Sequence, residues 1–79
     1  MEQIQKTLTD IPICKECIIR NIHGEERQKL RLFDLGFFQG SRVIPLYECH
    51  GGGTRAYFVK NTLIAIRSVE ATKIVAEEA

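Results

Sequence analysis

The 79-residue sequence lacks any long apolar run, although 44% of its residues are hydrophobic. A helix needs about 18 consecutive apolar residues to span a bilayer, so no membrane span is expected. The first residues, Met1 to Lys6, also lack the apolar segment of a secretory signal. We therefore expect a cytoplasmic protein with a single domain over residues 1–79, in which the polar residues 1–7 are loose.

An excess of charge of either sign is also missing. The chain carries 11 Lys and Arg residues against 10 Asp and Glu residues, which gives a formal net charge of +1. Dedicated nucleic-acid-binding domains usually have a strong basic excess. The balance of charge therefore predicts that nucleic acid is not a partner.

No pattern typical of a catalytic site is present. The carboxylates Asp34, Glu48 and Glu70 are scattered, and no Ser or Cys lies in a turn that would expose a nucleophile. The glycines at 51–53 are followed by Thr54, but they lack the Lys and the following helix of a phosphate-binding loop. The sequence therefore predicts a protein that is not an enzyme and that requires no cofactor.

Cysteine and histidine are few, with three Cys and two His. An odd number of cysteines is not typical of a disulfide framework, so free thiols in a reducing compartment are expected. Cys14 and Cys17 nevertheless have the spacing of a metal knuckle, and Cys49 with His50 could complete a site for zinc or iron. Adjacent strand residues point to opposite sides, which is poor geometry for Cys49 and His50 as joint ligands. Unligated thiols, metal binding and redox switching all stay open.

The segment from Leu30 to Gly40 is the most informative local pattern. Gly36 can take the positive φ of a helix stop, and Phe37 can then pack back on Leu32. A second glycine, Gly40, turns the chain again before the next strand. The segment predicts a short helix that leads directly into a β-sheet.

The remaining elements are short. Pro45 lies inside an apolar run. Because proline has no N–H, it predicts either an edge strand or a strand position that donates no hydrogen bond to the neighbouring strand. The pair Lys60 and Asn61 predicts a tight hairpin turn, and Ser68 can cap a single helical turn over 69–72. The pattern predicts a helix over 25–35 and strands over 17–22, 42–48, 55–59, 62–66 and 74–76.

Together these elements predict a mainly β fold. About five strands, with a short helix between the first two strands and one helical turn before the last strand, fit a small β-barrel, because closure of a sheet removes its exposed edges. An edge around Pro45 could also permit pairing with a second copy of the chain.

Several short motifs occur in a characteristic order. They are Leu35-Gly36-Phe37-x-x-Gly40-x-x-Val43, the glycine turn at 51–53, and Ile64-Ala65-Ile66-Arg67-x-x-Glu70-Ala71-x-x-Ile74. Their order and spacing resemble a known family, ferrous iron transport protein A (FeoA), from about Leu8 to Val75. The resemblance implies an SH3-like barrel, also similar to the C-terminal domain of iron-dependent repressors of the diphtheria toxin repressor type.

The resemblance also implies a function. It implies a small cytoplasmic accessory of the membrane ferrous iron transporter, whose cytoplasmic part carries a GTP-binding domain. The chain departs from the family pattern at three positions. Gln39 stands where the family usually has Pro, Asn61 where it usually has Gly, and Cys14 near a common Gly.

Two groups of residues are candidates for a partner-binding surface. Arg27, Lys29 and Arg31 give the predicted helix a basic surface that could steer an acidic partner. Arg42, Arg55 and Lys60 add charge along the strands, although a solvated face explains such charges equally well. Since two consecutive aromatic residues are hard to bury together, an exposed Phe38, with Tyr47 or Tyr57 near it, could line a groove for a partner.

Overall fold

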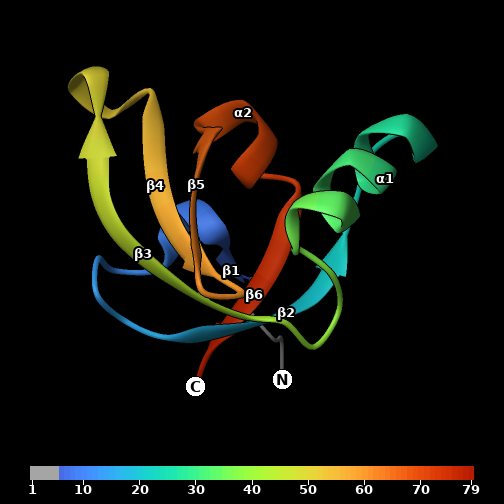
Figure 1. Cartoon of the computed structure of the whole chain (residues 1–79), viewed down its shortest axis with the longest axis horizontal. Helices are drawn as coiled ribbons and strands as arrows, with labels where there is room; N and C mark the ends of the chain where they lie inside the picture. Colours follow the sequence, from blue (N-terminus) through green and yellow to red (C-terminus); the bar gives the residue numbers. More distant parts are fainter. Residues whose placement is uncertain (1–5) are drawn as a thin grey trace, which may run out of the picture.

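The computed structural model describes residues 6–79, which form one curled antiparallel sheet with two short helices (Figure 1). The strand order in the sheet is β1-β6-β2-β3-β4-β5. The predicted small β-barrel is therefore confirmed, with six strands in place of about five. The strands are β1 (Lys6–Thr7), β2 (Cys17–Ile22), β3 (Arg42–Cys49), β4 (Thr54–Val59), β5 (Thr62–Arg67) and β6 (Ile74–Glu78).

The additional strand lies at the N-terminus. Residues 1–5 lie outside the described part of the chain, so the prediction that residues 1–7 are loose is tested only at Lys6 and Thr7. There the prediction is wrong, because both residues pair with β6, Lys6 opposite Ala76 and Thr7 opposite Val75. A two-residue strand carries no sequence pattern of its own, and its partner lies about 70 residues away in the chain.

The strand β3 joins the two halves of the sheet. It pairs with β2 only through Val43 and Arg42 and then continues along β4 as far as Cys49. Pro45 lies where β3 has left β2, and its carbonyl accepts a hydrogen bond of 2.6 Å from the Cys14 N–H. This confirms that Pro45 donates no ladder bond, and it shows that the strand edge at Pro45 is covered by the chain itself.

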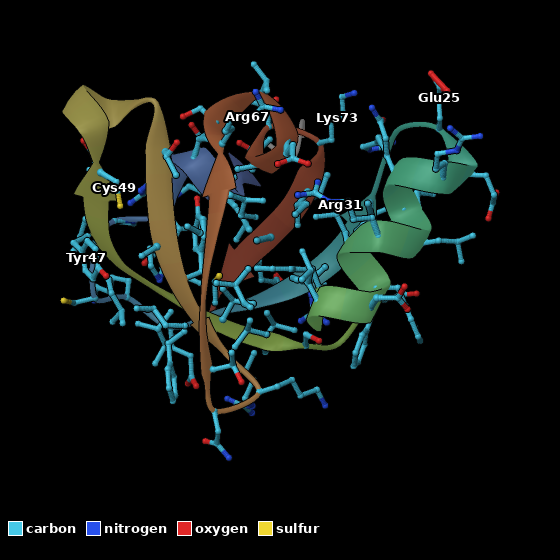
Figure 2. All side chains as sticks on the ribbon, turned by 45° about the horizontal axis from the view of Figure 1, so that its top comes forward. Glu25, Arg31, Tyr47, Cys49, Arg67 and Lys73 are labelled. Carbon is cyan, nitrogen blue, oxygen red and sulfur yellow. The ribbon has the colours of Figure 1, made fainter. Side chains whose placement is uncertain are left out.

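The core lies inside the curl of the sheet, where side chains from the strands and from α1 (Glu26–Leu35) meet (Figure 2). Its largest fully buried side chains are those of Tyr57 and Phe37, which pack edge to face with ring centroids 6.1 Å apart. The buried cluster comprises Leu8, Ile11, Cys17, Ile19, Leu32, Phe37, Val43, Tyr57, Val59, Ile66, Ala71, Ile74 and Ala76.

The helix α1 begins and ends as its sequence predicts. Glu25 is the N-cap, and Gln28 completes a capping box with it. At the other end Gly36 takes φ of 106°, and the Phe37 N–H donates to the Leu32 carbonyl at 2.8 Å. A Cβ on Gly36 would lie 3.1 Å from Cγ of Lys60, so the helix end also packs tightly on the turn between β4 and β5.

Two further turns fix the remaining strands. Lys60 and Asn61 have φ of 52° and 62°, which confirms the predicted tight hairpin between β4 and β5. The helical turn α2 (Ser68–Ala71) is also confirmed, but its N-cap is Arg67 and not Ser68. The Ser68 hydroxyl instead donates to the Gly52 carbonyl, which ties α2 to the 3-10 helix η2 (His50–Gly52).

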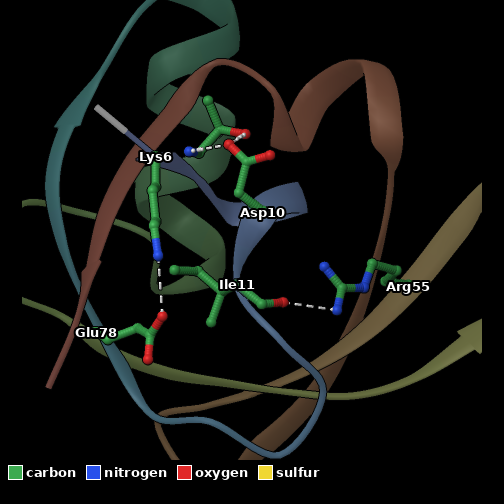
Figure 3. A network of polar contacts seen from close by, with 6 residues as sticks. Lys6, Asp10, Ile11, Arg55 and Glu78 are labelled. Carbon is green, nitrogen blue, oxygen red and sulfur yellow. Dashed lines mark hydrogen bonds and ion pairs between the residues drawn. The ribbon is translucent and has the colours of Figure 1, made fainter. Parts of the chain in front are cut away.

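A buried arginine bridges the gap between the edge strands β1 and β5. Arg55 of β4 is only 6% exposed, and its guanidinium donates to the Ile11 carbonyl at 2.9 Å (Figure 3). It also donates to the Leu8 carbonyl at 3.0 Å. A third bond reaches the Thr9 carbonyl at 3.3 Å. These carbonyls belong to the 3-10 helix η1 (Leu8–Asp10) and its C-cap. The expectation that Arg55 adds charge to the surface of the strands is therefore wrong.

None of the helices in residues 6–79 has the length and apolar character needed to cross a bilayer.

We predict that Arg55→Ala destabilises the fold strongly. The substitution removes three hydrogen bonds and leaves the buried Ile11 carbonyl without its arginine donor, whereas the Leu8 carbonyl keeps the Ile11 N–H. We expect the free energy of unfolding to fall by about 2–3 kcal/mol. Arg20→Ala is the matched control, because Arg20 makes an exposed ion pair with Glu77 that is worth less than about 1 kcal/mol. Urea unfolding of the three proteins measures both changes. Equal losses for the two variants would contradict the bridging role of Arg55.

Candidate functional site

The structure separates the residues that were predicted to bind a partner. Figure 2 shows Arg31 on α1 and Tyr47 on β3 at opposite sides of the sheet. Tyr47 is 49% exposed, whereas Tyr57 is completely buried. The assignment of Tyr57 to an exposed groove is therefore wrong, because its side chain lies in the core and packs against Phe37. The assignment of Tyr47 and Phe38 to a partner-binding surface stays a prediction.

The basic residues of α1 have three different environments. Arg27 is exposed, and Lys29 is half-buried. Arg31 forms an ion pair with Glu70 of α2, and its side chain stays 57% exposed. The predicted basic surface is therefore accessible at Arg27 and Arg31 and partly accessible at Lys29.

An apolar surface lies beside these charges. Leu30 and Phe33 are 56% and 57% exposed, although both lie on a helix that buries Leu32. The Phe33 ring packs against the half-buried Phe38 with centroids 5.0 Å apart. We call Leu30, Phe33 and Phe38 the α1 apolar patch. The sequence signal was present, because Leu30 and Phe33 are three residues apart and form a second stripe beside that of Leu32 and Leu35.

A shallow pocket of about 210 Å³ lies next to this patch, on the outer face of the sheet. Lys60 connects the two surfaces, because it lines the pocket and its Nζ lies 4.8 Å from the centroid of the Phe38 ring. We call this the β3–β4 pocket. It is lined by Glu16, Arg42, Ile44, Phe58, Lys60 and Asn61.

The three cysteines are free and differ in accessibility. Cys14 is exposed and takes φ of 69°, which is strained for a residue with a Cβ, while Cys49 is half-buried. Cys17 is completely buried, and its thiol donates to the Val43 carbonyl at 3.3 Å. Burial, with a smaller effect of Glu16, raises the pKa of the Cys17 thiol from an ordinary 9.0 to about 11.

This arrangement bears directly on the predicted metal ligands. Within the described residues, no three His, Cys, Asp or Glu side chains lie together in a way that could hold one metal ion. The side chain of His50 lies outside the described part of the structure. A thiol with a raised pKa resists the deprotonation that metal ligation requires, so Cys17 is a poor ligand. The described residues therefore do not fit a resident metal site.

Residues 6–78 match the family model of the FeoA domain. The fold is also similar to solved structures. A FeoA protein from Chlorobium tepidum has a TM-score of 0.86 and 20% identity, with 92% of this chain and 70% of that chain covered. None of the curated proteins matches this chain.

Two further structures extend the comparison. A FeoA protein from Stenotrophomonas maltophilia, solved in complex with zinc and described as an SH3 domain protein, has a TM-score of 0.78 and 26% identity over 91% of this chain and 89% of that one. The manganese regulator SloR has a TM-score of 0.79 and 12% identity, with 92% of this chain and 34% of that chain covered. The expected SH3-like fold and its similarity to metal-dependent regulators are thus confirmed.

We predict that the buried Cys17 thiol makes stability fall at high pH. Because the pKa of the Cys17 thiol is higher in the folded state, the unfolded chain releases the proton first as the pH rises. The contribution of Cys17 to the free energy of unfolding is therefore complete below pH 9 and is lost as the pH rises toward about 11. Urea unfolding in reducing buffer at pH 8 and pH 10.5 should show a smaller loss for Cys17→Ala than for the unchanged protein. Cys14→Ala should behave like the unchanged protein, and equal losses in all three would contradict the assignment.

Proposed function

Because this chain belongs to the FeoA domain family, we propose that it is an accessory protein of ferrous iron transport that acts by binding another protein. The proposed partner is the cytoplasmic GTP-binding part of a membrane ferrous iron transporter. The similar protein from Stenotrophomonas maltophilia is described as a candidate activating factor of bacterial ferrous iron transport. Membership of the family supports the link to iron transport, and the surface of the molecule supports the mode of action.

The α1 apolar patch is the observation that carries this proposal. Leu30 and Phe33 expose more than half of their surfaces to solvent, and Phe38 extends the same patch beyond the end of the helix. A contiguous apolar surface on a small domain marks a site of interaction, and aromatic residues are enriched at the centres of interfaces. We propose that these three side chains form the centre of the contact with the transporter.

The charged residues around the patch have a different role. We propose that Arg27 and Lys29 attract an acidic surface of the partner, which increases the rate of association more than the affinity. Arg31 is paired with Glu70 and contributes by fixing α1 against α2. Figure 2 shows Tyr47 on β3 apart from Arg31 on α1, so we propose that any contact that Tyr47 makes with a partner is a separate one.

The described residues favour a binding role over a catalytic one. The carboxylates Asp34, Glu48 and Glu70 lie on α1, β3 and α2, and Glu70 is held in an ion pair. The residues that line the β3–β4 pocket include no Cys, Ser or His. We infer that the chain acts through its surface.

Metal binding is the second candidate, because the similar Stenotrophomonas maltophilia protein was solved with zinc. In this chain Cys14 and Cys49 are the thiols with access to solvent, and His50 follows Cys49 directly. Such a site would require Cys14, Cys49 and His50 to come together around the metal, without Cys17, whose thiol is buried and donates to the Val43 carbonyl.

We predict that Phe33→Glu abolishes capture of the transporter domain. A carboxylate at the centre of the contact removes apolar area and adds a charge that must be desolvated, so we expect binding to weaken by at least about tenfold. The cytoplasmic domain of the transporter, immobilised at low salt, is the bait. Val69→Glu is the matched control, because Val69 is 66% exposed on α2, outside the patch. Equal binding by the unchanged protein and Phe33→Glu would show that the α1 apolar patch is not part of the interface.

We predict that the reduced protein retains much less than one equivalent of zinc or iron after dialysis. Metal analysis of the unchanged chain and of the double variant Cys14→Ser, Cys49→Ser provides the measurement. A full equivalent in the unchanged chain that disappears in the double variant would establish the second candidate, because loss of two soft ligands destroys a site of this kind.

A further inference from the structure

The β3–β4 pocket carries an imbalance of charge that the fold itself produces. The register of the two strands places Val43 opposite Val59 and Ile44 opposite Phe58. Arg42 of β3 and Lys60, the turn residue after β4, lie just beyond this pairing, and both line the pocket. Two cations in one pocket repel each other, so their arrangement is unfavourable unless an anion lies between them.

The chain supplies one carboxylate for these two positive charges. Glu16 lines the same pocket and forms an ion pair with Arg42, in which Nη1 and Oε1 are 3.2 Å apart. Within the described residues Lys60 forms no ion pair, and its ammonium group lies over the Phe38 ring. The pocket therefore contains two cations and one carboxylate, and Lys60 remains available to a further carboxylate.

The position of Lys60 is fixed by the backbone. Lys60 and Asn61 both have positive φ in the turn between β4 and β5, and Cγ of Lys60 packs close to Gly36 at the end of α1. These contacts hold the base of the side chain, so less conformational entropy is lost when its ammonium group binds a ligand. A lysine held in this way differs from one that moves freely in solvent.

The floor of the pocket is apolar. Phe58 is 38% exposed, and the half-buried Ile44 lies opposite it in the neighbouring strand. Inorganic anions gain nothing from such a floor, whereas an apolar side chain next to a carboxylate buries its surface there. The combination favours a peptide segment over a free phosphate.

We propose that the β3–β4 pocket binds an aspartate or glutamate side chain of a partner segment that also carries an adjacent apolar residue. The carboxylate lies between Lys60 and Arg42, and the apolar neighbour covers Phe58 and Ile44. Since Lys60 also borders the α1 apolar patch, one segment of the partner can span both surfaces. This inference rests on the proposed function for the identity of the natural partner.

Two blocked synthetic peptides test the chemistry of the pocket. Each contains leucine and phenylalanine around a central residue, which is glutamate in one peptide and glutamine in the other. Titration into the ¹⁵N-labelled full chain should shift the amides of Ile44, Phe58 and Asn61, with binding about three to five times tighter for the glutamate peptide. Lys60→Gln should abolish this preference.

The control variant is Arg67→Gln, which removes the same charge at the opposite end of β5 and should keep the preference. Equal binding of the two peptides, or a preference that survives Lys60→Gln, would overturn the proposal. Matching shifts with inorganic phosphate at the same concentration would overturn it too, since they would show a site for any anion.

Capture of the transporter domain distinguishes a failure of this inference from a failure of the proposed function. If the unchanged chain does not capture the domain, the proposed function fails. If the unchanged chain and Lys60→Gln capture the domain equally well, the pocket proposal fails alone. Weaker capture by Lys60→Gln, with unchanged capture by Arg67→Gln, supports both.

Discussion

The fold depends on one buried cation. The sheet has two edge strands, β1 and β5, that do not pair with each other, and Arg55 bridges this gap from β4 to the carbonyls around η1. A buried guanidinium is costly to desolvate, so it is stable here because three carbonyl oxygens accept its hydrogen bonds. The Tyr57 ring lies 5.8 Å from the guanidinium carbon, and within the described residues the buried Nε of Arg55 and the buried Tyr57 hydroxyl have no hydrogen-bond partner. In this way a domain of 79 residues closes its core without a continuous ring of strand pairs.

The same compactness brings the two proposed contact surfaces together. Gly36 ends α1 against the turn that contains Lys60, and the Ser41 hydroxyl donates to the Gly36 carbonyl at 2.7 Å within the buried part of this corner. Phe38 lies between the helix and the turn, in contact with Phe33 on one side and Lys60 on the other. The α1 apolar patch and the β3–β4 pocket are therefore neighbours because of how the helix stops, and not because they are near in sequence.

Local signals in the sequence predicted most of the secondary structure. Some segments have backbone preferences that depend only on neighbouring residues, so their elements were identified within a residue or two. Examples are Gly36, the turn at Lys60 and Asn61, and the run from Cys17 to Ile22. What could not be predicted depends on residues that are distant in the chain. The burial of Arg55 requires carbonyls 44 to 47 residues away, and β1 exists only because β6 lies beside it.

The candidate site was predicted less well than the fold, for a related reason. A strand pattern does not say which of its alternating faces is the core, so Tyr57 was assigned to the surface although it is the largest buried side chain. The exposure of Leu30 and Phe33 likewise depends on which stripe of α1 meets the sheet, and Leu32 occupies that position. Aromatic residues identify candidates for a contact surface, but only tertiary packing decides which of them solvent can reach.

The central claim is that this protein acts through the outer face formed by the end of α1 and the turn between β4 and β5. Amide hydrogen exchange of the chain, alone and bound to the cytoplasmic domain of the transporter, tests it most directly. The account predicts that binding slows exchange over residues 30–38 and 58–61 and leaves the opposite face around Tyr47 unchanged. Slower exchange around Tyr47 and Cys49, with no change at the end of α1, would contradict it.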